Sequence, residues 1–167
     1  NLVNTYFKKE PTDAILEDLR SCHGEIVKEL FEDDAQPVLE EIDNKLVEVE
    51  WALDDPDGLD RHFQYDQIVS IGEMLSTKII SAYLKHRGLT NEWVDARDLI
   101  RTDNNYQDAK IELDTSKEMT NKRISRATEK ANVVVTQGFI GGTSENFTTT
   151  LGREGSDFTA AILAYSL

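Results

Sequence analysis

The sequence predicts an α/β fold with a mostly helical N-terminal part. Up to about residue 88 the apolar residues recur at steps of three and four, which is the spacing of one helix face. From about residue 90 short apolar runs alternate with helical patterns, and three valines at 133–135 precede several glycines, which is typical of a buried strand in a parallel sheet. We therefore expect a helical subdomain over 1–88 and an α/β part over 89–167.

Three helices are predicted in the first part. One apolar stripe predicts a helix over 13–31, and a second predicts a helix whose first turn contains Pro37, where proline is tolerated. Because only the short polar break at 32–36 separates them, these two helices should pack antiparallel. A third apolar stripe predicts a longer helix over 59–86.

Two positions in these helical patterns need an explanation. Gly72 lies inside the third helix, where glycine costs about 1 kcal/mol relative to alanine. We expect that another segment approaches the backbone there, or that a helix begins there, and either arrangement would place Glu73 at a crevice. Further on, Thr115 and Glu118 match a capping box and predict a helix that begins at Thr115.

The charge is concentrated at one end of the chain. The 167 residues include 32 acidic and 18 basic side chains, a net charge of −14, and residues 1–60 hold 18 acids and 5 bases, net −13. Solvated helix faces explain this pattern, with a cation-binding or partner-docking face as the alternative. An acidic chain is not suited to neutralising nucleic-acid phosphates, so we expect no nucleic-acid partner.

Several other classes are disfavoured by composition. No apolar run approaches 18 residues, so no membrane span is predicted. Cys22 is the only cysteine and the three histidines are dispersed, so neither a disulfide framework nor a metal site is expected. No secretory signal is visible, which favours a cytoplasmic protein.

The segment after the valines is the candidate binding site. Ligands of open α/β sheets bind at the carboxyl ends of strands, and Gly138 begins a glycine-rich stretch at such an end. Arg153, Ser156 and Asp157 then precede a predicted helix over 158–165, whose N-terminus and arginine suit a carboxylate or phosphate. The structural alternative is that Ser156 or Asp157 only caps this helix and that Arg153 is a surface charge.

The same segment resembles a known family. The runs QGFIG (137–141), TTTLGR (148–153) and GSDFTAA (155–161) resemble the central signature of aspartate kinases, which are amino-acid kinases. Upstream, the runs VSIGEMLST (69–77), WVDARD (93–98) and RTD (101–103) resemble that family's Ser-x-Gly-Glu helix and the strand and loop that follow it. The matching blocks cover residues 66–167 in order.

This resemblance implies a partial amino-acid-kinase fold, a carbamate-kinase-like three-layer sandwich. It implies that ATP phosphorylates the side-chain carboxylate of L-aspartate to give 4-phospho-L-aspartate, the first step to lysine, threonine and methionine. Mg²⁺ would come with ATP. No nucleotide- or metal-binding residue is expected in this chain, because the family's N-terminal phosphate loop and its later nucleotide segment are missing. The chain is thus expected to be an inactive central fragment of a homo-oligomeric enzyme that assembles through regulatory domains.

The resemblance also implies roles for single residues. Glu73 would accept the substrate ammonium group, and Phe139 would wall the pocket. Arg153 would bind a substrate carboxylate with its guanidinium, aided by backbone N–H groups around Gly155 and Ser156.

Two acidic residues, Glu154 and Asp157, lie close to Arg153 in the sequence. Asp157 would hold a catalytic lysine in place, and it is the one catalytic residue expected here. Glu154 stands where family members often carry glycine or a small polar residue, and it would repel an anionic substrate unless it points outward. Two alternatives remain open: another amino-acid kinase with a different acceptor, and a non-catalytic module whose acidic helices at 1–86 dock a basic partner.

Overall fold

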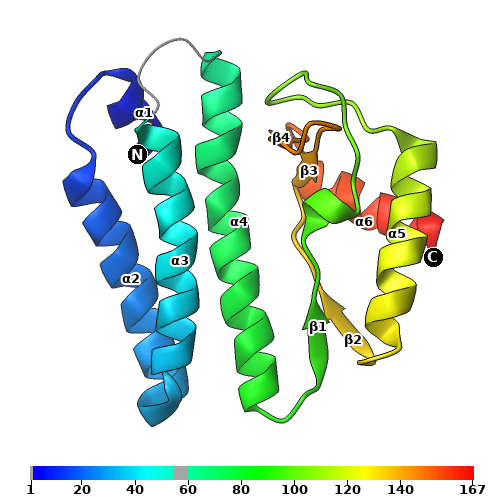
Figure 1. Cartoon of the computed structure of the whole chain (residues 1–167), viewed down its shortest axis with the longest axis horizontal. Coiled ribbons are helices and arrows are strands. Elements are labelled where there is room, and N and C mark those ends of the chain that lie inside the picture. The colour runs from blue at the N-terminus through cyan, green and yellow to red at the C-terminus, as the bar shows by residue number, and fades with distance from the viewer. Residues whose placement is uncertain (1, 55–59) are drawn as a thin grey trace.

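Helices form one side of the molecule, and short strands with two further helices form the other (Figure 1). The computed structural model describes residues 2–54 and 60–167. The helical side consists of α1 (Leu2–Phe7), α2 (Asp13–Phe31), α3 (Gln36–Leu53) and α4 (Arg61–His86), with a short 3-10 turn between α2 and α3. The predicted start of the third helix, at residue 59, lies outside the described residues, and Asp60 caps α4 by accepting a hydrogen bond of 3.1 Å from the N–H of His62.

The boundaries of α2 and α3 confirm the apolar periodicity. Helix α2 spans the predicted residues, Pro37 lies in the first turn of α3, and the two helices run antiparallel (Figure 1). Their apolar stripes meet α4 in one core, which provides most of the hydrophobic stabilisation of this side. Its central side chains are Val27, Phe31, Ile42, Leu46, Val49, Ile68, Ile71, Leu75 and Ile79.

The interpretation of Gly72 is wrong. This residue is exposed in the middle of α4, so no helix begins there. Apart from its chain neighbours and the backbone of its own helix, no described atom lies within 4 Å of a Cβ built on it. Gly72 therefore only weakens the helix, and the position of Glu73 has another cause.

The strands form two small sheets. Strands β1 (Asn91–Trp93) and β2 (Val133–Val135) pair in parallel, with Asn91 opposite Val133. Strands β3 (Ile140–Gly142) and β4 (Thr148–Thr150) form an antiparallel hairpin. The parallel pairing of the valine strand is confirmed, but its residues are half-buried rather than buried, because in this chain the strand has β1 as its partner along one edge.

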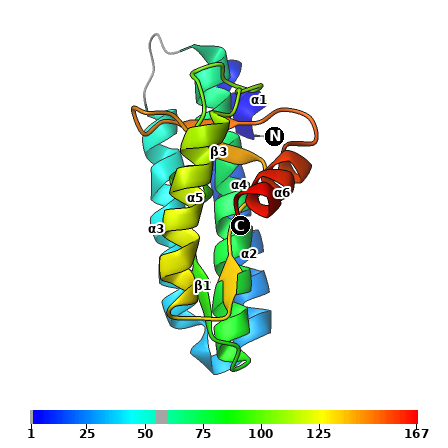
Figure 2. The same cartoon turned by 90° about the vertical axis from the view of Figure 1, so that its right-hand side faces the viewer.

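Two helices cover the strands on the side away from α4. Helices α5 (Leu113–Thr128) and α6 (Gly155–Ser166) pack on each other and on β2 and β3, respectively (Figures 1 and 2). A second core forms between them and the strands, with Leu99, Ile100, Ile124, Ala127 and Ile162 buried in it. The order helix, strand, helix confirms the predicted α/β class and the three-layer arrangement.

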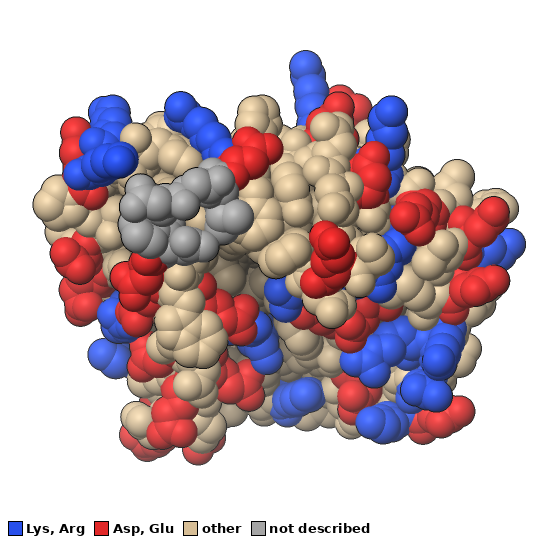
Figure 3. Space-filling model, turned by 45° about the horizontal axis from the view of Figure 1, so that its top comes forward, with Lys and Arg blue, Asp and Glu red and all other residues tan. Residues whose placement is uncertain are grey.

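Charged side chains cover the surface in both signs. Figure 3 shows acidic groups over the helical side and a cluster of Lys and Arg on the side where α5 lies. Between α2 and α3, Arg20 pairs with Asp43 at 3.1 Å and with Glu50 at 2.9 Å, and the hydrogen bond that Arg20 donates to Glu50 raises the pKa of Arg20. None of the described helices is both long and apolar enough to cross a membrane.

Candidate functional site

Helix α4 fixes the strand that leads into the arginine loop. The carboxylate of Asp66 accepts hydrogen bonds from the N–H of Thr150 at 2.8 Å, from its hydroxyl at 2.7 Å and from the N–H of Gln107 at 2.9 Å. The amide of Gln67 accepts from the N–H of Thr148 at 3.2 Å and donates to its carbonyl at 2.8 Å. These side chains bond the backbone of β4 as an adjoining strand would.

Asp66 is completely buried, and this has an electrostatic consequence. Burial raises the pKa of the Asp66 carboxyl, because a desolvated charge is unfavourable, and the hydrogen bonds from Gln107 and Thr150 oppose that shift. The carboxyl is thus a structural acceptor at the base of the loop.

The loop after β4 presents Arg153 to solvent. Gly152 and Glu154 both have left-handed backbone conformations, with φ values of 71° and 61°, and α6 begins at Gly155. The Arg153 side chain is 95% exposed, and its Nε lies 3.9 Å from Oε1 of Glu154, which is itself 68% exposed. The guanidinium is therefore held loosely and can turn toward a ligand.

The start of α6 retains a backbone donor beside this arginine. The N–H of Gly155 donates to the carbonyl of Gly152 at 3.2 Å. The N–H of Ser156 has no acceptor among the residues that the structure describes. Together with the helix dipole, this leaves an anion-compatible end next to Arg153.

Phe139 lies against the same helix end. Its φ of 70° is rare for a residue with a side chain, and its backbone is held at both ends: its N–H donates to the Thr159 hydroxyl at 3.2 Å and its carbonyl accepts from Leu151 at 2.9 Å. A Cβ on Gly155 would lie only 2.9 Å from the Phe139 ring. The structure thus brings together Phe139 and the helix start that includes Gly155 and Ser156.

Asp157 is exposed in the first turn of α6. Its backbone N–H donates to the carbonyl of Glu154 at 2.9 Å. No lysine contacts its carboxylate within the described ranges. The structure therefore places Asp157 beside the arginine loop, while its role toward a lysine stays a prediction.

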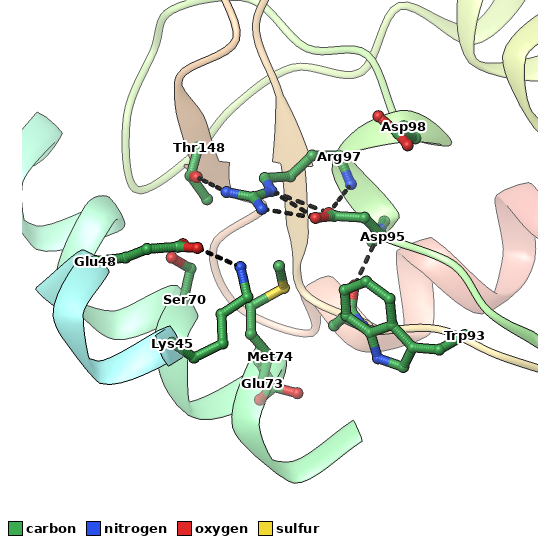
Figure 4. Close-up of polar contacts among 12 residues, drawn as sticks. Lys45, Glu48, Ser70, Glu73, Met74, Trp93, Asp95, Arg97, Asp98 and Thr148 are labelled. Carbon is green, nitrogen blue, oxygen red and sulfur yellow. Dashed lines mark hydrogen bonds and ion pairs between the residues drawn. The ribbon is translucent and has the colours of Figure 1, made fainter. Parts of the chain in front are cut away.

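Glu73 comes from a different layer. It is half-buried on α4, and its carboxylate has no hydrogen-bond or ion-pair partner among the described residues. In Figure 4 it points away from the Arg97–Asp95 pair. No polar contact in the described part of the chain joins it to Arg153, so a ligand or a larger assembly would have to bridge the two.

Sequence reasoning assigned no role to a third polar cluster, which follows β1. Asp95 caps the 3-10 turn at Ala96–Asp98 by accepting from the N–H of Arg97 at 3.0 Å, and its carboxylate also binds the Arg97 guanidinium, with Nη2 to Oδ2 at 2.6 Å (Figure 4). Arg97 reaches on to the Thr148 hydroxyl at 3.2 Å. The pattern Asp-x-Arg at 95–97, shortly after β1, was the available signal.

This cluster has its own electrostatics and its own cavity. Burial lowers the pKa of Arg97, but the hydrogen bonds and charge of Asp95 outweigh this and the net shift is upward. Beside it lies a polar cavity of about 280 Å³, lined by Asp95, Arg97, Asp98, Arg101, Gly142, Thr143 and Asn146. Its arginines already have protein partners, so it does not by itself call for a ligand.

No metal-binding cluster accompanies these residues. Within residues 2–54 and 60–167, no three His, Cys, Asp or Glu side chains gather closely enough to hold a metal ion.

Comparisons with known proteins give a consistent result. The model of the amino acid kinase family matches residues 11–167. The lysine-sensitive aspartokinase 3 of Escherichia coli is 37% identical over 102 residues, which are 61% of this chain and 22% of that protein. The aspartokinase of Chlamydia trachomatis is 32% identical over 152 residues, or 90% of this chain and 32% of that protein.

Solved structures show the same similarity. E. coli aspartokinase III in complex with lysine and aspartate superposes with a TM-score of 0.85 at 29% identity, over 99% of this chain and 38% of that chain. The same enzyme in complex with aspartate and ADP gives a TM-score of 0.83. The chain thus spans between 22% and 38% of the length of these relatives.

Proposed function

Because the chain belongs to the amino acid kinase family, we propose that it supplies the aspartate-binding part of an aspartate kinase. One observation carries this proposal: the exposed Arg153 directly precedes α6, whose first turn contains the N–H of Ser156 without an acceptor among the described residues and Gly155 close to the Phe139 ring. The relatives are named aspartokinases, and the E. coli structures contain aspartate, which supports the same ligand.

The proposed binding mode follows from charge. Aspartate carries two carboxylates and one ammonium group at neutral pH. Arg153 and the N–H of Ser156 would bind one carboxylate, since a guanidinium and a helix N-terminus both favour anions. Glu73, whose carboxylate lacks a partner in the described part of the chain, would accept the ammonium.

The proposed reaction transfers the γ-phosphoryl group of ATP to the side-chain carboxylate of aspartate and gives 4-phospho-L-aspartate. Such transfers depend mainly on positioning and charge neutralisation. Asp157 would orient a lysine, and Arg153 would hold the acceptor. Mg²⁺ would arrive on the ATP phosphates and neutralise their charge, and no described residue is assigned to it.

The proposal also covers the pathway, the compartment and the assembly of the enzyme. The product would enter the route to lysine, threonine and methionine in the cytoplasm, and the enzyme would be a homo-oligomer. The chain would divide into a helical part at 1–88 and an α/β part at 89–167. An independent acidic docking module is disfavoured, because Asp66 and Gln67 of α4 bind β4 rather than leaving the helices separate.

A calorimetric ligand comparison on the 167-residue chain tests this function. L-aspartate should bind, whereas succinate, which lacks the ammonium group, should bind more weakly by about tenfold because it loses one charge-assisted contact. Equal binding of the two would contradict the role of Glu73, and no binding of either would contradict the proposed site.

A further inference from the structure

The hydroxyl of Thr77 joins the layers that carry the candidate site. It donates to the backbone carbonyl of Glu73 at 2.8 Å, one turn earlier in α4. It accepts from the side-chain amide of Gln137 at 2.7 Å and from the indole N–H of Trp93 at 3.1 Å. This single buried oxygen therefore contacts α4, β1 and the segment after β2.

Gln137 extends the connection. Its side chain is 1% exposed, and its carbonyl oxygen accepts from the N–H of Ala96 at 2.8 Å. The next residue, Gly138, packs on α6 so closely that a Cβ there would lie 2.9 Å from the Ser156 side chain. An unbroken series of contacts thus runs from Glu73 through Thr77 and Gln137 to the start of α6.

We propose that Thr77 and Gln137 are positioning residues that set where Glu73 stands relative to Ser156 and Arg153. This inference rests on the proposed function, because it concerns the ammonium site and the carboxylate site of one ligand. A buried network whose donors are satisfied has one favourable geometry, and loss of one member leaves a buried donor unpaired. We call the hydrogen bonds of Thr77 to Glu73, Gln137 and Trp93 the Thr77 junction. The distance between Glu73 and the start of α6 therefore depends on this junction.

Ser76 provides a matched control. Its hydroxyl also donates to the carbonyl of Glu73, at 3.1 Å, but it lies on the exposed side of α4. No hydrogen bond joins it to Gln137 or Trp93 in the described part of the chain. Ser76→Ala therefore removes a similar contact to Glu73 without touching the junction.

The test measures the affinity for L-aspartate by calorimetry on the 167-residue chain. Thr77→Val should weaken binding roughly 10- to 100-fold, the scale of a small misplacement of a binding group. Thr77→Ser, which keeps the hydroxyl, and Ser76→Ala should bind like the unaltered chain. In the Glu73→Gln background Thr77→Val should weaken binding much less, since it acts through Glu73.

The outcomes separate this inference from the function on which it rests. If the unaltered chain binds aspartate and Thr77→Val binds equally well, or if its effect is as large in the Glu73→Gln background, the inference is wrong. If the unaltered chain does not bind aspartate, the proposed function fails and this inference fails with it. Should Thr77→Val not fold, Trp93→Phe removes one donor to the same hydroxyl and must show the same dependence on Glu73.

Discussion

The carboxylate of Asp66 accepts two hydrogen bonds from Thr150, at 2.8 Å from the N–H and at 2.7 Å from the hydroxyl, across 84 residues of chain. Two residues after Thr150, the backbone turns through Gly152 toward Arg153. The helical side therefore does more than cover the strands, since α4 also anchors the loop that carries the proposed carboxylate ligand.

Replacing this anchor should destabilise the fold. Asp66→Asn keeps the shape but turns an acceptor into an NH₂ group, so at least one buried donor loses its partner. We expect a loss of about 1–3 kcal/mol in the free energy of unfolding, measured by urea denaturation. Asp98→Asn, at a half-exposed carboxylate paired with Arg123, should cost much less. Equal effects of the two substitutions would contradict the anchoring role.

The pKa of Asp66 predicts a pH dependence. Burial raises this pKa in the folded chain, so the folded state holds its proton more tightly than the unfolded state does. The contribution of Asp66 to stability is then largest below the unfolded pKa of about 3.9 and declines as the pH rises through the folded pKa. The stability difference between the unaltered chain and Asp66→Asn should be larger near pH 4 than near pH 7. A difference that grows with pH would contradict this assignment.

Two glycine substitutions should have opposite effects. Gly155→Ala would place a Cβ 2.9 Å from the Phe139 ring and 3.0 Å from the Leu151 Cβ, and such overpacking costs about 1–3 kcal/mol. Gly72→Ala meets no described atom within 4 Å and should stabilise α4 by up to about 1 kcal/mol. Thermal unfolding of both variants checks this prediction. Stabilisation by Gly155→Ala would contradict the close packing of the Phe139 ring on Gly155.

The helices could be predicted from sequence because their information is local. The stripe over 13–31 matches the bounds of α2, and the predicted break at 32–36 with Pro37 after it marks the start of α3. The capping box at Thr115 was wrong: α5 begins at Leu113, with Glu112 before it. Tertiary contacts explain this, because Ser116 bonds the backbone of Arg101 in both directions, accepting at 2.9 Å and donating at 3.2 Å.

The candidate site could be predicted only in part. The glycine-rich run and the arginine loop stand out in the sequence, and the structure brings Phe139 and Gly155 together. Thr77 bonds Gln137 across 60 residues and Asp66 bonds Thr150 across 84, and polar residues inside a helix give no local sign of such partners. Glu73 was identified by its resemblance to the family's motif, whereas the hydrogen bond from Thr77 to its carbonyl is visible only in the folded structure.

Loss of the negative charge at Glu73 should remove the preference for an ammonium group. Glu73→Gln should bind aspartate and succinate with similar affinities, whereas the unaltered chain should favour aspartate by about tenfold. Glu118→Gln, at an exposed position of α5, serves as the matched control and should leave the preference unchanged. A preference for aspartate that survives Glu73→Gln would place the ammonium elsewhere.

The central claim is that Arg153 binds a carboxylate of aspartate. Its most direct test is a calorimetric titration of Arg153→Ala with L-aspartate, with Arg123→Ala as the control, because Arg123 is a half-exposed arginine of α5. Arg153→Ala should weaken binding by about tenfold or more, the value of a hydrogen bond to a charged group, while Arg123→Ala should bind like the unaltered chain. Unchanged affinity of Arg153→Ala would contradict the account.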